Sequence, residues 1–337
     1  MPLLKLIQPT ILEDFGKPIQ AALDEVAAAG GGEVVLAPGR YPFTGPLRVG
    51  NHTVLRGSGG TTLVARLPDK AAVRAEGRQI TLAGFAVEGA ARNRTGFTDA
   101  SGIAVIDAEG VRLDGLDISA TAAAGIIVLN SARVQISGCT VRNSLADGFH
   151  ITARSRFVQI TGCASRDNGD DLFACVGYGK NGGQVENVVI SGCQGSNGKG
   201  RGIACLGTRN LVVSGNLIEG TDAAGLYLHQ EENYQTYGST AITVTGNLFA
   251  DVSRRVNHAG LFVGGSDGAR PAGDGSIPNA IDGVLLCGNL LDGSGSDGAY
   301  LSPNAIRVRG SGNLIRRAKR VAFRNDSRDA KVDFETQ

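Results

Sequence analysis

One motif recurs along this chain and constrains its fold more than any other feature. It is a short apolar run, usually closed by Ser or Thr, then Gly, then Cys or Asn. The motif ends in turn at Cys139, Cys163, Cys193, Asn216, Asn247 and Asn289. Its shortest spacing is about 23 residues, a repeat length at which each unit buries its apolar face on the next. The sequence therefore predicts an all-β solenoid, in which equivalent residues of successive coils lie side by side.

Composition narrows the classes of protein to consider. The chain has 50 Gly in 337 residues without a Gly-X-Y period, which excludes collagen. Its net charge is +1 and its basic residues are scattered, apart from residues 316–320, so we expect no nucleic-acid partner. We also expect no membrane span and no signal peptide, because no apolar run is long enough and residues 1–6 lack a signal's features. These data assign neither a localisation nor an oligomeric state.

The expected order along the chain is that of one β-helix domain, residues 1–337. Residues 1–16 are predicted to be an irregular lead-in. Residues 17–29 have apolar side chains at helical spacing and end at a run of three Gly, so we expect a short α-helix that caps the first coil. Coils are expected over about 33–315, followed by a charged C-terminal tail at 316–337 that either covers the other end or is partly ordered.

The six cysteines are predicted to be reduced and buried. Two groups of them occupy equivalent positions of the repeat: Cys139, Cys163 and Cys193, and then Cys175 and Cys205. There is no Cys-x-x-Cys pair and no His at ligand spacing beside them, which argues against a metal site. We therefore expect thiols that fill the core.

The opening segment resembles the N-terminal signature of the pectate-lyase-like superfamily. The resemblance rests on Ile-Gln-Ala-Ala-Leu-Asp at 19–24, Gly-Gly-Gly-Glu-Val at 30–34 and Leu-Ala-Pro-Gly-Arg-Tyr at 36–41. Members of that superfamily are right-handed parallel β-helices, and many process polysaccharides. The resemblance thus implies an all-β, single-stranded, right-handed parallel β-helix.

Three insertions interrupt the base period: residues 178–184, 231–240 and 264–280. Loops that break a repeat on one side commonly form the walls of a binding face. We expect this role for the first two, whereas the third, rich in Gly, Asp and Pro, fits a tolerated surface insertion.

Charged residues recur at one position of the coil, just before a second apolar strand. Asp147, Asp171 and Arg201 share this position, and Asp170 precedes Asp171. Adjacent coils lie about 4.8 Å apart, so these groups should form a ladder. When carboxylates lie this close together, the proton affinity of one of them rises. One carboxyl then serves as the acid and another as the base that glycosidic cleavage needs. Asp is also a common turn residue, and a purely structural role is the alternative.

The order of these segments resembles the glycoside hydrolase family that contains the polygalacturonases. That family has Asn-Thr-Asp-Gly, Gly-Asp-Asp, Gly-His-Gly and Arg-Ile-Lys on successive coils. The corresponding segments here are 145–148, 169–171, 200–202 and 225–229. The resemblance implies Asp170 as the general acid, with Asp147 and Asp171 holding and activating the attacking water.

This chain departs from the polygalacturonase pattern at several positions. Leu145 replaces the Asn, Arg201 replaces the His, and Tyr227 and His229 replace the Arg and Lys. Without that Arg and Lys, pectin is not the preferred substrate. Candidate substrate-binding residues are His150, Lys199, Arg201, Tyr227 and His229; the strand period places His150 and Tyr227 on the outer face, where Tyr227 is suited to stack on a sugar.

Three functions remain open, each with a polysaccharide or oligosaccharide partner. The first is a glycoside hydrolase that uses Asp147, Asp170 and Asp171 and needs neither cofactor nor metal. The second is a lyase or C5-epimerase of a uronic-acid polymer, with Tyr227, His150 or His229 as the base and Arg201 or Lys199 neutralising the substrate carboxylate. A Ca²⁺ ion is compatible with this second function, with the aspartates as ligands. The third is a non-catalytic carbohydrate-binding or phage-tail-type module.

Overall fold

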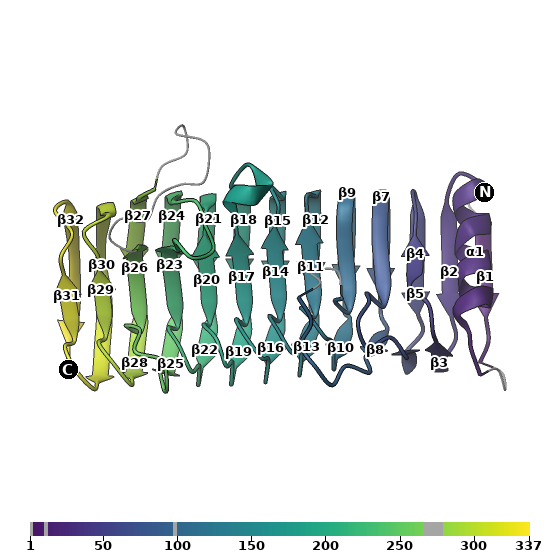
Figure 1. The fold of residues 1–337 in the computed structure, drawn as a ribbon, viewed down its shortest axis with the longest axis horizontal. Helices are drawn as coiled ribbons and strands as arrows, with labels where there is room; N and C mark the ends of the chain where they lie inside the picture. Colours follow the sequence, from purple (N-terminus) through teal and green to yellow (C-terminus); the bar gives the residue numbers. More distant parts are fainter. Residues whose placement is uncertain (1–2, 10–12, 97–99, 266–278) are drawn as a thin grey trace.

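The computed structural model describes residues 3–9, 13–96, 100–265 and 279–337. In these ranges the chain winds into a long solenoid whose strands stack in three parallel columns, as Figure 1 shows from the side. The first column consists of β1 (Leu3–Ile7), β2 (Gly32–Leu36), β5 (Thr53–Gly57), β7 (Val73–Ala83), β9 (Ile103–Asp114), β12 (Ala132–Ser137), β15 (Arg156–Thr161), β18 (Val185–Ser191), β21 (Thr208–Ser214), β24 (Ser239–Thr245), β27 (Ile281–Cys287), β30 (Ala305–Ala318) and β32 (Ala330–Thr336).

The second and third columns complete each coil. The second consists of β3 (Gly39–Phe43), β6 (Thr61–Ala65), β8 (Ala86–Glu88), β10 (Asp117–Ser119), β13 (Thr140–Arg142), β16 (Ala164–Arg166), β19 (Gln194–Ser196), β22 (Leu217–Glu219), β25 (Leu248–Val252) and β28 (Leu290–Ser294), and it continues into β30. The third starts at β4 (Leu47–Val49), shares the long strands β7 and β9, and continues with β11 (Ile126–Leu129), β14 (Phe149–Thr152), β17 (Phe173–Val176), β20 (Ile203–Leu206), β23 (Leu226–Gln230), β26 (Leu261–Gly265), β29 (Ala299–Leu301) and β31 (Phe323–Asn325).

The recurring motif marks the corner between the first and second columns. Its Gly residues lie in the left-handed region, for example Gly138 with φ 58° and Gly246 with φ 62°, a conformation that costs Gly less than any residue with a Cβ. The register then places the residue after each Gly inside the coil, at the same point of every repeat.

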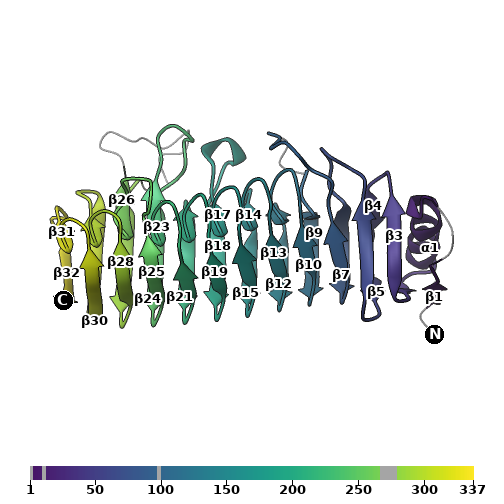
Figure 2. The same ribbon diagram turned by 90° about the horizontal axis from the view of Figure 1, so that it is seen from below.

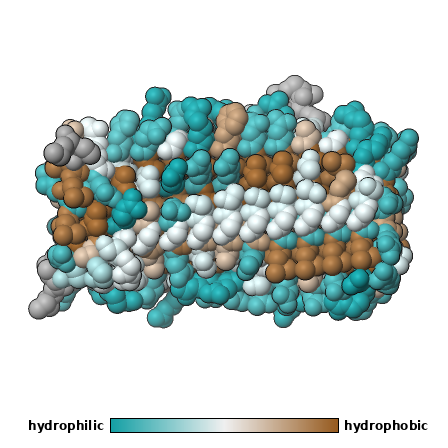
Figure 3. Space-filling view, turned by 180° about the vertical axis from the view of Figure 1, so that it is seen from behind, coloured by the Kyte–Doolittle hydropathy of each residue, from teal (hydrophilic) through white to brown (hydrophobic). Residues whose placement is uncertain are grey.

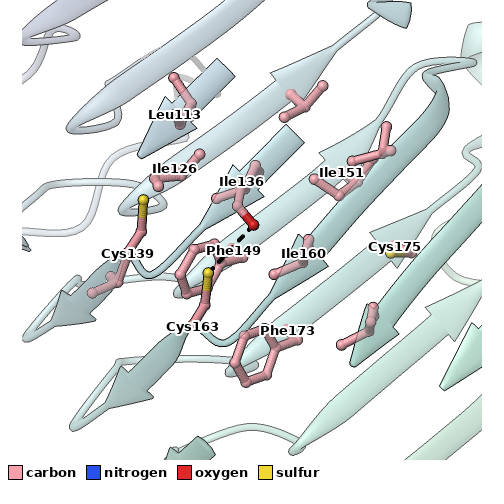
Figure 4. Close-up of a cluster of buried hydrophobic side chains, with 14 of the residues drawn as sticks. Leu113, Ile126, Ile136, Cys139, Phe149, Ile151, Ile160, Cys163, Phe173 and Cys175 are labelled. Atoms are coloured by element: carbon pink, nitrogen blue, oxygen red, sulfur yellow. Dashed lines mark hydrogen bonds between the residues drawn. The ribbon is translucent and has the colours of Figure 1, made fainter. Parts of the chain in front are cut away.

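The residue type at this inward position changes along the solenoid, from Cys in the earlier coils to Asn in the later ones. Figure 4 shows Cys139 and Cys163 in neighbouring coils, with the thiol of Cys163 donating to the carbonyl of Ile136 at 3.6 Å. Further on, the Nδ2 of Asn216 donates to the Oδ1 of Asn247 at 2.9 Å, and the same bond links Asn247 to Asn289 and Asn289 to Asn313. All six cysteines are free, and five are buried as predicted, whereas the prediction was wrong for Cys287, which is only partly buried.

The outer face of the solenoid repeats as regularly as the core. In the second column, Leu217, Leu248, Leu290 and Leu314 lie in register on neighbouring strands. Figure 3 shows similar side chains forming rows along the back of the molecule. One row, in white, has intermediate hydropathy, and another, in brown, is hydrophobic. The register of the repeat therefore holds over many coils, so residues can be placed by column.

The helix is α1 (Gly16–Ala28), one residue earlier than predicted at each end, and it lies at the N-terminal end of the solenoid in Figure 1. It buries Ile19, Leu23 and Val26, the apolar positions spaced three and four residues apart. These side chains belong to the same apolar cluster as the first coils.

The coil region was predicted too short at both ends. Residues 3–7 are not irregular but form β1, and the segment 316–337 is not a tail, because β31 and β32 pair in parallel with β29 and β30. A terminal strand has a neighbour on one side only, so its side chains stay more exposed and its sequence carries weaker apolar alternation. In β32 the alternating positions are Ala330, Val332 and Phe334, each only partly buried.

Candidate functional site

A groove of about 480 Å³ lies on the outer side of the third column. It crosses β14, β17 and β20, where the outward position holds His150, Ala174 and Ala204 in register. Loops rise beside it on one side of the solenoid, as Figure 2 shows. Its walls include residues of both insertions predicted to form them: Tyr178, Lys180, Asn181, Glu231 and Tyr234. The other predicted insertion, 264–280, falls mostly outside the described residues.

Asp147 occupies the floor of the groove and is only 9% exposed. Its Oδ2 lies 2.5 Å from the Nδ1 of His150, and its Oδ1 accepts the backbone N–H of Asp171 at 3.0 Å. The ring of His150 is parallel to the ring of Tyr178, with centroids 6.3 Å apart. Asp147 is thus held by one side chain and by the backbone of the next coil.

Asp171 lies one coil further along and is 4% exposed. Its Oδ1 accepts the backbone N–H of Arg201 at 2.7 Å and lies 3.0 Å from the Nε of the same residue. The predicted ladder of Asp147, Asp171 and Arg201 is therefore present, each rung bonded to the next. Gly200 makes this approach possible, because a Cβ there would lie 2.5 Å from the Oδ1 of Asp171.

Burial raises the pKa of the Asp171 carboxyl well above its usual value. Arg201 opposes this shift, while the charges of Asp147 and Asp170 add to it. The carboxyls of Asp147, Asp170 and Asp171 have oxygens that all lie within 4.8 Å of one another. Asp171 therefore keeps its proton above the pH at which an isolated Asp loses it.

We expect this shift to appear as a pH-dependent effect of Asp171→Asn on stability. Because the folded pKa lies above the unfolded value near 3.8, wild-type protein loses stability as pH rises from about 4 through the folded pKa. The variant cannot ionise at this position, so its melting temperature relative to wild type should rise over the same range. Thermal unfolding of both proteins from pH 4 to 8 measures the difference, and a constant difference would contradict the assigned shift.

Asp170 is the most exposed carboxylate of the three, with 32% of its side chain exposed. Its Oδ2 lies 2.8 Å from a terminal nitrogen of Arg94. Arg94 belongs to residues 89–102, which connect β8 to β9, and so reaches the groove from an earlier coil. Asp170 is therefore the carboxyl placed to meet a molecule bound in the groove.

The sequence did not single out Arg94 as a site residue. Its repeat position carries no motif, and it lies in a connection rather than on a strand. One signal was present, the length of the connection. Residues 89–102 join β8 to β9, whereas the equivalent connections of later coils, 143–148 and 167–172, are shorter. A long connection on the groove side is the type of loop that builds a binding face.

Two predicted substrate-binding residues are buried rather than exposed. Tyr227 is 4% exposed, its ring stacks on His229 at 4.4 Å, and the guanidinium of Arg201 lies 4.6 Å from its centroid. Its hydroxyl donates to Glu231 at 3.1 Å, and burial followed by the Glu231 charge raises its pKa. Tyr227 thus has no open face for a sugar, since neighbouring coils and the 231–240 insertion cover the strand.

His229 is 5% exposed, and burial, with the nearby charges of His258 and Arg201, lowers its pKa to about 3. It therefore stays neutral at ordinary pH and lies beneath Tyr227 rather than in the groove. Lys199 is exposed but is not among the residues lining the groove. Of the predicted substrate-binding residues, His150 and Arg201 do line it.

The groups that could hold a cation, within the described parts of the chain, are the same three aspartates. Oxygen donors suit Ca²⁺. Their oxygens, however, are already engaged by the ring of His150, by Arg94 and by Arg201. A cation would have to compete with two guanidinium groups, so this donor set does not fit a resident metal.

Among the described residues, no helix combines the length and apolar character needed to cross a membrane. A comparison of the sequence with curated proteins gives no match. Solved structures do match: the A-module of the mannuronan C-5 epimerase AlgE4 of Azotobacter vinelandii gives a TM-score of 0.72 at 15% identity, covering 96% of each chain.

Two further structures are similar in the same way. The catalytic domain of a GH87 α-1,3-glucanase, in complex with nigerose, gives a TM-score of 0.75 at 14% identity, covering 99% of this chain and 68% of that one. A family 28 exopolygalacturonase of Yersinia enterocolitica gives 0.68 at 14% identity, covering 99% and 78%. A family model described as the right-handed beta helix region matches residues 101–335. With parallel columns from β1 to β32 and this match over most of its length, the chain belongs to the right-handed β-helix family.

Proposed function

We propose that this chain is a glycoside hydrolase that cleaves a polysaccharide, with Asp147, Asp170 and Asp171 as its acid and base groups. The observation that carries the proposal is the convergence of three carboxylates from two coils, with oxygens within 4.8 Å of one another on the floor of a groove. Glycosidic cleavage needs one carboxyl that gives a proton and another that activates water.

The environments of the three groups support a division of labour. Asp170 is the most exposed and faces the groove, so it donates the proton to the leaving oxygen. Asp147 and Asp171 lie deeper, fixed by backbone N–H groups, and position and activate the water. Asp171, whose pKa is raised by burial, stays protonated and holds the water. Asp147 accepts the proton that the water gives up, and this proton returns to Asp170 after each turnover.

The similar structures support the general class. An epimerase, a glucanase and an exopolygalacturonase each act on a carbohydrate polymer by their printed names. At 14–15% identity the likeness itself establishes the fold, so the assignment of hydrolysis rests on the carboxylate cluster.

The lyase or epimerase alternative is less well supported by the same geometry. Its candidate bases Tyr227 and His229 are buried, and His150 is bonded to Asp147. Its candidate neutralising group Arg201 is already paired with Asp171 and lies 3.5 Å from Glu231. A proton abstraction next to a substrate carboxylate would need an accessible base and a free cation at one point.

A screen of purified protein against neutral and acidic polysaccharides tests the proposal. We expect new reducing ends without a new ultraviolet chromophore, with no requirement for Ca²⁺. Absorbance that grows with chain breaks would instead indicate elimination, and C5 inversion without chain breaks would indicate an epimerase. Retention of a glycan without any turnover would indicate a binding module.

A further inference from the structure

Both guanidinium groups in the groove already have a carboxylate partner. A terminal nitrogen of Arg94 lies 2.8 Å from Asp170. Arg201 lies 3.0 Å from Asp171 through its Nε and 3.5 Å from Glu231 through a terminal nitrogen. Each guanidinium on the groove therefore has a carboxylate partner before any substrate binds.

The remaining cation lining the groove is Lys180, and it is placed differently. It lies in the short helical turn η1 (Gly179–Asn181), is exposed, and its ammonium is 5.4 Å from the ring centroid of Tyr178. A flexible, solvated lysine at this rim provides a weak and screened attraction. By contrast, four carboxylates line the groove: Asp147, Asp170, Asp171 and Glu231.

The lining also includes apolar surface beside the carboxylates. Ala124, Ile127 and Leu129 lie on the N-terminal side, and Ala174, Val176 and Leu206 lie along the strands. Binding sites for uncharged ligands combine such apolar walls with a few placed polar groups. The hydroxyls of a neutral sugar can donate to the carboxylates and contact these walls without leaving a charge unpaired.

We infer that the substrate of this groove is an uncharged glycan and that uronic-acid polymers are excluded; the inference rests on the proposed hydrolase function. A uronic polymer brings a carboxylate on each sugar. Here that carboxylate would lie among four others, with both guanidinium groups taken, so its lost hydration would not be replaced by a favourable pair. A neutral chain has no such cost.

The test compares one glycan in two charge states. A neutral polysaccharide that the protein cleaves is oxidised at C6 to its uronate form, and kcat/KM is measured for both. We expect the oxidised form to be cleaved at least about tenfold more slowly, and cleavage of the neutral form to be insensitive to salt. Cleavage of an acidic glycan as fast as its neutral counterpart would overturn this inference and leave the hydrolase function standing. Cleavage of no glycan at all would instead contradict the hydrolase function itself.

A variant of Glu231 tests the charge argument directly. Glu231→Gln removes one carboxylate and releases a terminal nitrogen of Arg201, so the ratio of oxidised to neutral turnover should rise about fivefold. Glu186→Gln is the matched control, since Glu186 pairs with Arg209 at 2.7 Å outside the groove. An unchanged ratio in Glu231→Gln, or a ratio that falls in Lys180→Gln, would contradict the inference.

Discussion

Replacing Asp170 by Asn should lower kcat by about 10²–10⁴-fold, the range typical of a lost general acid. The amide has the same shape but cannot deliver the proton that the leaving oxygen needs. The fold should be unaffected, because Asp170 is partly exposed and its ion pair with Arg94 is of the surface type, worth at most about 1 kcal/mol. The measurement is the initial rate of reducing-end release, with the melting temperature recorded on the same sample.

Asp167→Asn is the matched control for this variant. Asp167 precedes Asp170 by three residues, is exposed, and has a φ of 56°, which Asn accepts as readily as Asp. The same charge is removed from the same turn, so a loss of rate in both variants would point to the net charge of the turn. Wild-type turnover by Asp170→Asn would remove this residue from the mechanism.

The repeat made the architecture predictable in its middle part. Wherever Gly and then Cys or Asn recurred, that Cys or Asn lies inside the coil and the strand register follows. The ends were not predicted, because β1 and β32 bury one face against a single neighbour and carry a weaker pattern. The asparagine ladder also continues to Asn313, within the predicted coils but one coil beyond the last motif identified in the sequence, at Asn289.

For the site, the sequence predicted the contacts within a column and the two insertions that line the groove, but it missed the contact of Arg94 and the burial of Tyr227. Asp147, Asp171 and Arg201 share one repeat position, so their contact followed from coil spacing. The burial of Tyr227 depends in part on Glu231 and on the ring of His258, both of which lie outside the strands. An outward-facing position in a solenoid is exposed only where no loop folds over it.

The asparagine ladder leads to the second large expected effect, on stability. Asn247 is 2% exposed, and its Oδ1 accepts from both the backbone N–H and the Nδ2 of Asn216, at 3.0 and 2.9 Å. Its Nδ2 donates to Asn289 and to the carbonyl of Val213. Asn247→Ala would leave these buried groups without partners, so we expect a loss of about 3–5 kcal/mol in the free energy of unfolding.

Cys163→Ala provides the comparison, because the same column holds a thiol there. Cys163 is also 2% exposed but makes only weak sulfur contacts, so its truncation should cost about 1–2 kcal/mol. A solenoid can unfold in parts, so urea midpoints are best combined with amide hydrogen exchange. The backbone N–H of Asn216 should exchange faster in Asn247→Ala, while amides near Cys163 keep their protection. Equal costs for the two variants would mean that the ladder stabilises the coil by filling space, with no net contribution from its hydrogen bonds.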